Sequence, residues 1–377
     1  MSSMLFGGSG VGGRPELYTS YDADMALFNT RAKLWSVQGL VLLAALLPFV
    51  LADDLLVLLS RAFAFAVGAI GLNLVTGYAG QVSLGHAVFV GIGAFTAAAL
   101  SGDPDGRTLG FGLPMIVWLP AAALLPAAVG ALIAPLATRL RGLYLAIVTL
   151  GLVFIGDHIF READFITGGF GVGRPGVVAS VFGVSLTDSG PSMTGQQKTY
   201  FFALVVLVVV AILGRNIART AVGRAFQAVR DRDIAAEVIG VELTKHKVLA
   251  FTVSSAFAGL AGALLYTITR QVVPESFSLL LSVQFIAMIL IGGASTISGS
   301  IAGAVFLTVV LRLSEELSRF FSFIPSPGQQ GGLLNTAQVS TILYGFLIVG
   351  FLLFEPRGLF GVWIRIRNYW KGWPFSY

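Results

Sequence analysis

The 377-residue chain contains no cysteine, so disulfides, zinc-thiolate centres and cysteine nucleophiles are excluded. Histidine is scarce as well. His86, His158 and His246 are the only three, and none has a partner at the spacing of a helical metal site. Clustered acid-base or metal-ligating residues, which a membrane-bound enzyme would need, are also missing. We therefore expect neither an enzyme nor a metal or cofactor site.

Charge is the second shortage. Only 11% of the residues are charged, against about 25% in soluble domains. Hydrophobic residues make up 56% of the chain, and the mean hydropathy is +0.85. The net charge is +5, but basic and aromatic residues do not alternate as in nucleic-acid-binding proteins, so nucleic acid is not an expected partner. The excess of basic residues is typical of the cytoplasmic loops of a membrane protein. The lipid bilayer is the expected surrounding.

A nucleotide-binding loop is also missing, because G-x4-G-K-[ST] occurs nowhere. Any ATP must therefore be bound by another subunit. No carboxylate or lysine lies convincingly at the middle of an apolar run, where an ion-coupled secondary transporter would bind its coupling ion. That class stays as the less favoured alternative.

Apolar runs dominate what is present, and each covers all or most of a roughly 30 Å hydrocarbon layer. The fold class they predict is an all-α polytopic membrane protein with about ten transmembrane helices. The runs at 83–100 and 199–214 are short, so some helices are expected to be broken or re-entrant. The ten runs are 34–52, 55–76, 83–100, 112–137, 143–160, 199–214, 248–268, 279–297, 301–318 and 338–354.

Lysine and arginine predict the orientation. The densest basic cluster, from Arg215 to Lys247, follows the sixth run and is expected in the cytoplasm. Both termini then face inward. The predicted organisation is a polar cytoplasmic tail (1–33), a permease domain (34–355) and a cytoplasmic C-terminal tail (356–377). Within the permease domain, 214–247 is the cytoplasmic loop and 161–198 an extracytoplasmic loop, in which dense glycine and proline predict ordered turns or short helices.

Two polar, glycine-rich junctions interrupt the apolar runs: GYAGQVSLGH at 77–86 and IGGASTISGS at 291–300. Their Gly-x-Ala-x3-Ser patterns align without gaps and suggest a parallel internal duplication. Polar side chains at membrane depth usually face the bundle interior or water, so they are candidates for the substrate path. Capping of helix ends is the equal alternative for each, and His86 could simply bond two helices. The candidates are Asn73, Thr76, Tyr78, Gln81, Ser83, His86, Ser295 and Ser298.

A few charges lie near the interiors of predicted spans, chiefly Arg61 and Asp157. Snorkelling to the outer interface explains both. The alternative is an Arg61–Asp157 pair across the outer vestibule, which would attract zwitterionic substrates or hold two helices together.

The cytoplasmic loop contains an amphipathic pattern from Arg224 to Ile239, with Gly240 as a stop. A solvated charged loop is the alternative. Its apolar members Phe226, Val229 and Ile239 are expected to fill a groove on a partner, with charged neighbours at the rim. The residues assigned to this helix are Arg224, Phe226, Val229, Arg230, Asp231, Arg232, Asp233, Ala235, Ala236, Glu237 and Gly240.

Several segments in fixed order resemble the LivM-type permease subunits of branched-chain amino acid ABC transporters, from about residue 34 to 360. They are GLNLVTGYAGQVSLGHAVFVGIGAF, RGLYLAIVTLG, TGGFG, GRAFQAVRDRDIAAEVIGV, KHKVLAFTVSSAFAGLAGAL, PESFSLLLSVQFIAMILIGGASTISGSIAGA and EPRGLFG. Ala235-Ala236-x3-Gly240 also resembles the Glu-Ala-Ala-x3-Gly loop with which importer permeases dock on their ATPases, although Ile234 replaces the Glu. The outer TGG segment continues FGVGRPG and so departs from the family's TGG-x-x-G spacing.

The resemblance implies an ABC importer permease of the branched-chain amino acid/ribose type in a bacterial inner membrane. The implied partners are a second, LivH-type permease, two cytoplasmic ATPases that bind the ATP, and an extracytoplasmic solute-binding protein. The implied cargo is a branched-chain or related amino acid, and the alternative is the same machinery for urea, short amides or other small solutes.

Overall fold

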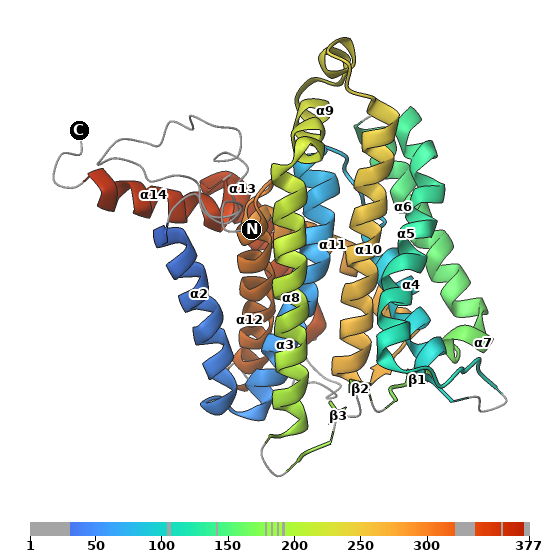
Figure 1. Cartoon of the computed structure of the whole chain (residues 1–377). Coiled ribbons are helices and arrows are strands. Elements are labelled where there is room, and N and C mark those ends of the chain that lie inside the picture. The colour runs from blue at the N-terminus through green and yellow to red at the C-terminus, as the bar shows by residue number, and fades with distance from the viewer. Residues whose placement is uncertain are drawn as a thin grey trace.

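The computed structural model describes residues 31–103, 107–140, 142–177, 179–181, 184–186, 188–190, 193–320, 336–355 and 357–372. It is helical apart from four two-residue strands (Figure 1). The helices are α2 (Arg31–Leu46), α3 (Asp53–Leu72), α4 (His86–Ser101), α5 (Met115–Arg139), α6 (Leu143–Glu162), α7 (Asp164–Thr167), α8 (Gly195–Arg219), α9 (Ala221–Val238), α10 (Leu243–Thr269), α11 (Leu279–Gly292), α12 (Ile297–Phe320), α13 (Thr336–Phe354) and α14 (Gly358–Gly372). Short 3-10 helices η1 (Leu47–Phe49) and η3 (Pro274–Phe277) and a π-helical segment η2 (Asn73–Tyr78) complete the helical elements.

Each of the ten predicted apolar runs contains a helix, but the helices differ in length. Among the described residues, five segments are long and apolar enough to cross a membrane: Asp53–Tyr78, Met115–Leu136, Tyr144–Glu162, Gly195–Arg219 and Leu243–Thr269. α11 and α12 form a pair bent by 119°, which is a sixth candidate if it is counted as one span. The chain is therefore an all-helical polytopic membrane protein with five or six candidate spans.

The core forms around α10, which packs against α3, α4 and α5. Small residues permit the close approach. A Cβ on Gly262 of α10 would collide with the carbonyl oxygen of Val90 in α4, and a Cβ on Gly93 would collide with the backbone of Gly259. Glycine at such crossings lets two membrane helices pack backbone against backbone. These contacts hold α3 and α4, the two helices that flank the first polar junction.

The two ends of the bundle differ. α9 lies at one end, and α7 with strands β1 (Arg174–Pro175), β2 (Ser180–Val181), β3 (Val184–Ser185) and β4 (Gln271–Val272) lies at the other (Figure 1). β1 pairs antiparallel with β4, with Arg174 opposite Val272, and β2 pairs with β3 in the same sense. The described part of the 161–198 loop thus contains the four-residue helix α7 and three short strands, and β1 fastens it to the end of α10.

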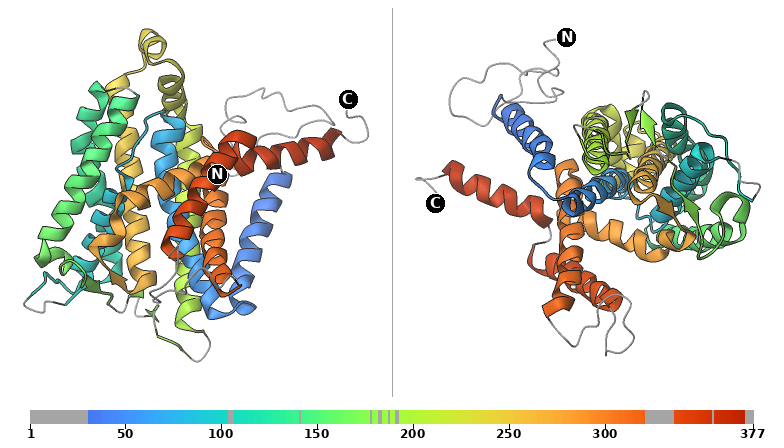
Figure 2. Two further views of the ribbon diagram at one scale, coloured as in Figure 1. Left: turned by 180° about the vertical axis from the view of Figure 1, so that it is seen from behind. Right: turned by 90° about the horizontal axis from the view of Figure 1, so that it is seen from below.

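The predicted C-terminal tail contains α14, which extends sideways across the direction of α8 and α10 (Figures 1 and 2). Most of the predicted N-terminal tail, residues 1–30, lies outside the described residues, as do 373–377. The suggested Arg61–Asp157 pair is wrong. Asp157 Oδ2 instead accepts a hydrogen bond from Arg161 Nε at 2.8 Å, because the two residues are four apart on α6.

Candidate functional site

The first junction begins where α3 widens into η2. The six residues Asn73–Tyr78 form a π-helical segment, a rare geometry that occurs often at functional sites. The segment ends in a tight turn at Gly80, whose φ of +68° suits glycine. A backbone hydrogen bond closes the turn, because the backbone N–H of Gln81 donates to the carbonyl oxygen of Val75 at 2.9 Å. The chain then enters α4 at His86.

The second junction joins α11 to α12 through a sharp bend. Gly293 has φ +119°, and Ser295 has φ +61°, a left-handed conformation that is uncommon for a residue other than glycine. α11 has only 14 residues, or about 21 Å of helix at 1.5 Å per residue, which is too short to cross the bilayer alone. The bend of 119° therefore marks a broken or re-entrant segment. The sequence pointed instead to 83–100 and 199–214, and the second of these is wrong, because 199–214 lies within the 25-residue α8.

Asn73 joins the two junctions. Its Nδ2 donates to the carbonyl oxygen of Thr296 at 2.9 Å and to Ser300 Oγ at 2.7 Å, and its Oδ1 accepts from the Ser295 amide at 2.9 Å. The Asn73 side chain is fully buried. A buried amide with three satisfied hydrogen bonds is a structural connector, so Asn73 fastens the end of α3 to the start of α12.

Arg230 of α9 reaches the same place from the neighbouring loop. Its Nη1 donates to Ser295 Oγ at 2.7 Å and to the carbonyl oxygen of Gly77 at 3.1 Å. Ser295 Oγ itself donates to the Gly77 carbonyl at 2.7 Å. Gly80 makes room for the arginine, since a Cβ there would lie 2.5 Å from Arg230 Cγ. One guanidinium thus contacts both junctions, while Asp231 Oδ1 accepts from its Nε at 2.9 Å.

The other path candidates have differing surroundings. His86 is buried, its Nε2 lies 2.9 Å from the Gly68 carbonyl oxygen, and its ring packs edge-on against Phe285. It therefore bonds two helices, the simpler of the two roles considered. Tyr78 and Ser83 are buried, and Thr76 Oγ1 donates to the Gln81 carbonyl at 3.1 Å. Ser298 is exposed on the first turn of α12.

Gln81 differs from its neighbours. Its side chain is 5% exposed, yet neither Oε1 nor Nε2 has a hydrogen-bond partner among the described residues. An unsatisfied buried amide costs free energy, and such groups in native proteins call for an explanation such as an unseen water or a functional role. Gln81 is consequently a path candidate whose buried side chain has hydrogen-bonding capacity left for a transported polar molecule.

α9 forms over Ala221–Val238, close to the predicted 224–239. It is broken at Arg232, where φ is −156° and ψ is 99°, and it stops at Gly240 with φ +89°. The part before the break packs on this chain, whereas the part after it projects from the end of the bundle (Figure 1). Arg224, Ala235 and Glu237 are exposed, Asp233 is half-buried, and Ala236 is buried.

One detail of the docking prediction is corrected. Phe226 is fully buried and Val229 is 6% exposed, so neither fills a partner's groove. Phe226 packs instead against His246 at the start of α10. The exposed apolar residues of the projecting part are Ile234, Val238 and Ile239, at 65%, 83% and 76% exposure. The amphipathic pattern located the helix but could not tell an internal apolar contact from an external one.

Sequence reasoning missed the hydrogen bonds from Arg230 to the two junctions. It also missed Ser300, whose hydroxyl accepts a hydrogen bond from the Asn73 side chain. Arg230 is one of several basic residues in the loop, and the sequence carries no signal that singles it out. Within the described part of the chain, no group of three or more histidine, aspartate or glutamate side chains is placed to hold a metal ion.

Comparison with known proteins gives the family. The sequence model of one protein family, the branched-chain amino acid transport system permease component, matches residues 55–352. The chain is 30% identical over 339 residues to the high-affinity branched-chain amino acid transport system permease protein LivM of Salmonella typhimurium, covering 86% of this chain and 74% of the relative. Identity to LivM of Escherichia coli is 30% over 347 residues, or 88% and 75% of the two chains.

A more distant match is the probable branched-chain amino acid transport permease protein LivH of Methanocaldococcus jannaschii, 26% identical over 174 residues, or 45% of this chain and 51% of the relative. No solved structure matches the chain. A permease of this kind is a transport subunit rather than a catalytic ATPase, and it works with ATPase and binding-protein partners. The chain belongs to the family of permease components of branched-chain amino acid ABC transport systems.

Proposed function

We propose that this chain conducts branched-chain or related amino acids into the cell and that movement of an ATPase reaches its substrate path through α9. The observation that carries the proposal is the Arg230 contact with both junctions. The projecting part of α9 offers an exposed apolar surface to a partner, and Arg230 lies two residues before the break in that helix. A displacement of α9 would therefore act directly on the ends of η2 and α11.

The junctions form the inner gate in this scheme. Broken helices at membrane depth are tolerated where they line a cavity or are covered by protein, and transporters use them at substrate sites. Asn73 keeps the two junctions together, so they move as one unit when Arg230 is pulled. Gln81, with its unsatisfied amide, faces the passing substrate.

The assembly proposed around the chain contains a second, LivH-type permease, two cytoplasmic ATPases and an extracytoplasmic binding protein. Ile234, Val238 and Ile239 contact the ATPase, and Arg232, Asp233 and Glu237 surround them. The segment 214–247 is the coupling loop, 161–198 faces the outside, and the permease domain runs from 34 to 355. We place the assembly in a bacterial inner membrane, with about ten helices and both termini in the cytoplasm.

The test is uptake of radiolabelled leucine, valine and urea by proteoliposomes that contain the complete complex. The binding protein is added outside the vesicles, and ATP is enclosed within them. We expect leucine or valine uptake that requires ATP and persists when the proton gradient is dissipated. Uptake of urea alone would move the cargo to the alternative class. Uptake without ATP that stops with the proton gradient would overturn the proposal in favour of a secondary transporter.

A further inference from the structure

A cavity of about 610 Å³ opens at the end of the bundle opposite α9, between α3, α10, β4, η3, α11 and α12. Its volume falls within the roughly 300–1,000 Å³ of ligand pockets. Charges of both signs line it, namely Asp54 and Arg61 from α3 and Arg312 from α12. The remaining wall is largely apolar, with Val57, Leu58, Phe65, Leu265 and Leu281 among its residues.

Arg61 is informative because of its depth. It lies eight residues after Asp53, the first residue of α3, and hence about 12 Å along the helix. Its side chain is exposed, and neither Arg61 nor Asp54 makes a side-chain hydrogen bond or ion pair with any residue that the structure describes. An ionised residue at such depth normally faces a water-filled cavity or a protein partner and marks a substrate pathway. The position of Arg61 therefore favours a water-filled cavity over one filled by lipid tails.

We propose that this cavity is the outer amino-acid site of the permease, an inference that rests on the proposed function. Arg61 binds the α-carboxylate of a free amino acid, Arg312 adds positive charge beside it, and Asp54 accepts from the α-ammonium. Guanidinium and carboxylate groups form charge-assisted hydrogen bonds that are well suited to this recognition. The leucine and phenylalanine wall receives a branched aliphatic side chain.

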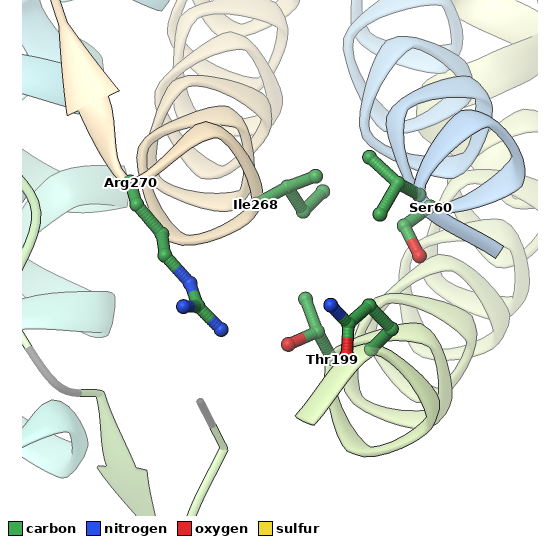
Figure 3. Close-up of a pocket in the computed structure, with 6 residues that line it drawn as sticks. Ser60, Thr199, Ile268 and Arg270 are labelled. Atoms are coloured by element: carbon green, nitrogen blue, oxygen red, sulfur yellow. The ribbon is translucent and has the colours of Figure 1, made fainter. Parts of the chain in front are cut away.

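The neighbouring pockets lack this chemistry. One of about 240 Å³ lies between α3, α8 and α10, where Arg270 and Ile268 face Ser60 and Thr199 (Figure 3). It contains no acidic residue, and both hydroxyls already donate within the chain, Ser60 to Leu56 and Thr199 to its own helix. Another of about 280 Å³ contains Asp103 but no basic residue. Among these three, only the 610 Å³ cavity offers a partner to each end of a zwitterion.

The chain's lack of cysteine permits a direct test in the complete complex. Leu58→Cys introduces a thiol into the cavity one helical turn from Arg61, and Val205→Cys introduces one on the apolar, exposed face of α8 as the matched control. A charged, membrane-impermeant thiol reagent added outside should label Leu58→Cys and leave Val205→Cys unlabelled. Leucine at saturating concentration should slow labelling of Leu58→Cys at least fivefold. No labelling of Leu58→Cys, or equal rates with and without leucine, overturns the proposal.

A second measurement tests the charge. Arg61→Gln should lower leucine uptake at least tenfold and abolish protection of Leu58→Cys by leucine, while Arg61→Lys keeps part of both. Arg270→Gln removes a charge from the neighbouring pocket and should change neither. If the unsubstituted complex moves no amino acid, the proposed function fails. If it moves leucine and Arg61→Gln does so equally well, only the site fails.

Discussion

Arg230 Nη1 lies 2.7 Å from Ser295 Oγ, and the same nitrogen donates to the carbonyl oxygen of Gly77. Two chain segments more than 200 residues apart are thus held by one side chain of a third, the loop helix α9. The arrangement matters because α9 is the element that projects from the bundle, whereas Gly77 and Ser295 lie in the breaks of two membrane helices. A force on α9 needs no further intermediate to reach both breaks.

The first prediction concerns that contact. Arg230→Ala removes both hydrogen bonds from the junctions, each worth about 1.5–3 kcal/mol when a charged group takes part and less here because the side chain is 35% exposed. We expect ATP-driven leucine uptake to fall roughly tenfold while ATP hydrolysis continues, since the motor would still dock. Uptake and hydrolysis are measured on the same proteoliposomes. Arg224→Ala, at an exposed position of the same helix, is the control and should leave the ratio of uptake to hydrolysis unchanged.

The second prediction concerns Asn73 and stability. Asn73→Ala leaves the backbone N–H of Ser295 without its acceptor and removes a fully buried side-chain amide. An unsatisfied buried donor costs about 1–3 kcal/mol, so the purified permease should unfold at a temperature several degrees lower. Thermal unfolding in detergent, followed by circular dichroism, measures the shift. Ser298→Ala, at an exposed position in the same junction, should unfold at the original temperature, and equal shifts for both variants would contradict the assigned role of Asn73.

The third prediction separates docking from folding on α9. Ile234→Asp combined with Val238→Asp places charge on exposed apolar positions, so the permease should accumulate normally yet fail to retain its ATPases during copurification. Phe226→Asp buries a charge and should reduce the amount of folded permease. ATPases that stay bound to the Ile234, Val238 double variant would show that another surface of the chain holds them.

The sequence predicted the features that depend on local composition. Each apolar run became a helix, because a stretch of Leu, Val and Ala without charge is stable in lipid only when its backbone bonds are internal. α9 was predicted from charges recurring among apolar residues, and Gly240 ends it as expected. The glycine-rich junctions were recognised because polar residues interrupt apolar runs.

Long-range relationships were out of reach. Nothing in the residues near Asn73 indicates that its amide meets Ser295, because that contact joins positions 222 apart and depends on how α3, α11 and α12 pack together. The surroundings of Phe226 were assigned wrongly for a similar reason. Its helical spacing marks an apolar face, and that face is equally suited to α10 of the same chain and to a partner protein.

The fourth prediction concerns the crossing of α4 and α10. Gly262→Val places a side chain where the Val90 carbonyl oxygen already touches the glycine backbone, so the two helices must separate. We expect little folded permease in the membrane. Gly345→Val, on α13 where no described residue would lie within 4 Å of the new Cβ, should accumulate as well as the unsubstituted protein. Quantification of membrane-inserted, protease-resistant protein distinguishes the two.

The last prediction uses the unsatisfied amide of Gln81. If the group served only the fold, an apolar substitution of similar length would relieve the cost of burying two unpaired polar atoms, about 1–3 kcal/mol, and change nothing else. We expect Gln81→Leu to raise the unfolding temperature and also to lower leucine uptake. The loss of uptake is expected because residues retained at a cost in stability are characteristic of functional sites. Gln81→Asn keeps the amide without adding a charge and should lose less uptake than Gln81→Leu. Unfolding temperature and uptake are measured on the same preparations, and a gain in stability with full uptake would remove Gln81 from the substrate path.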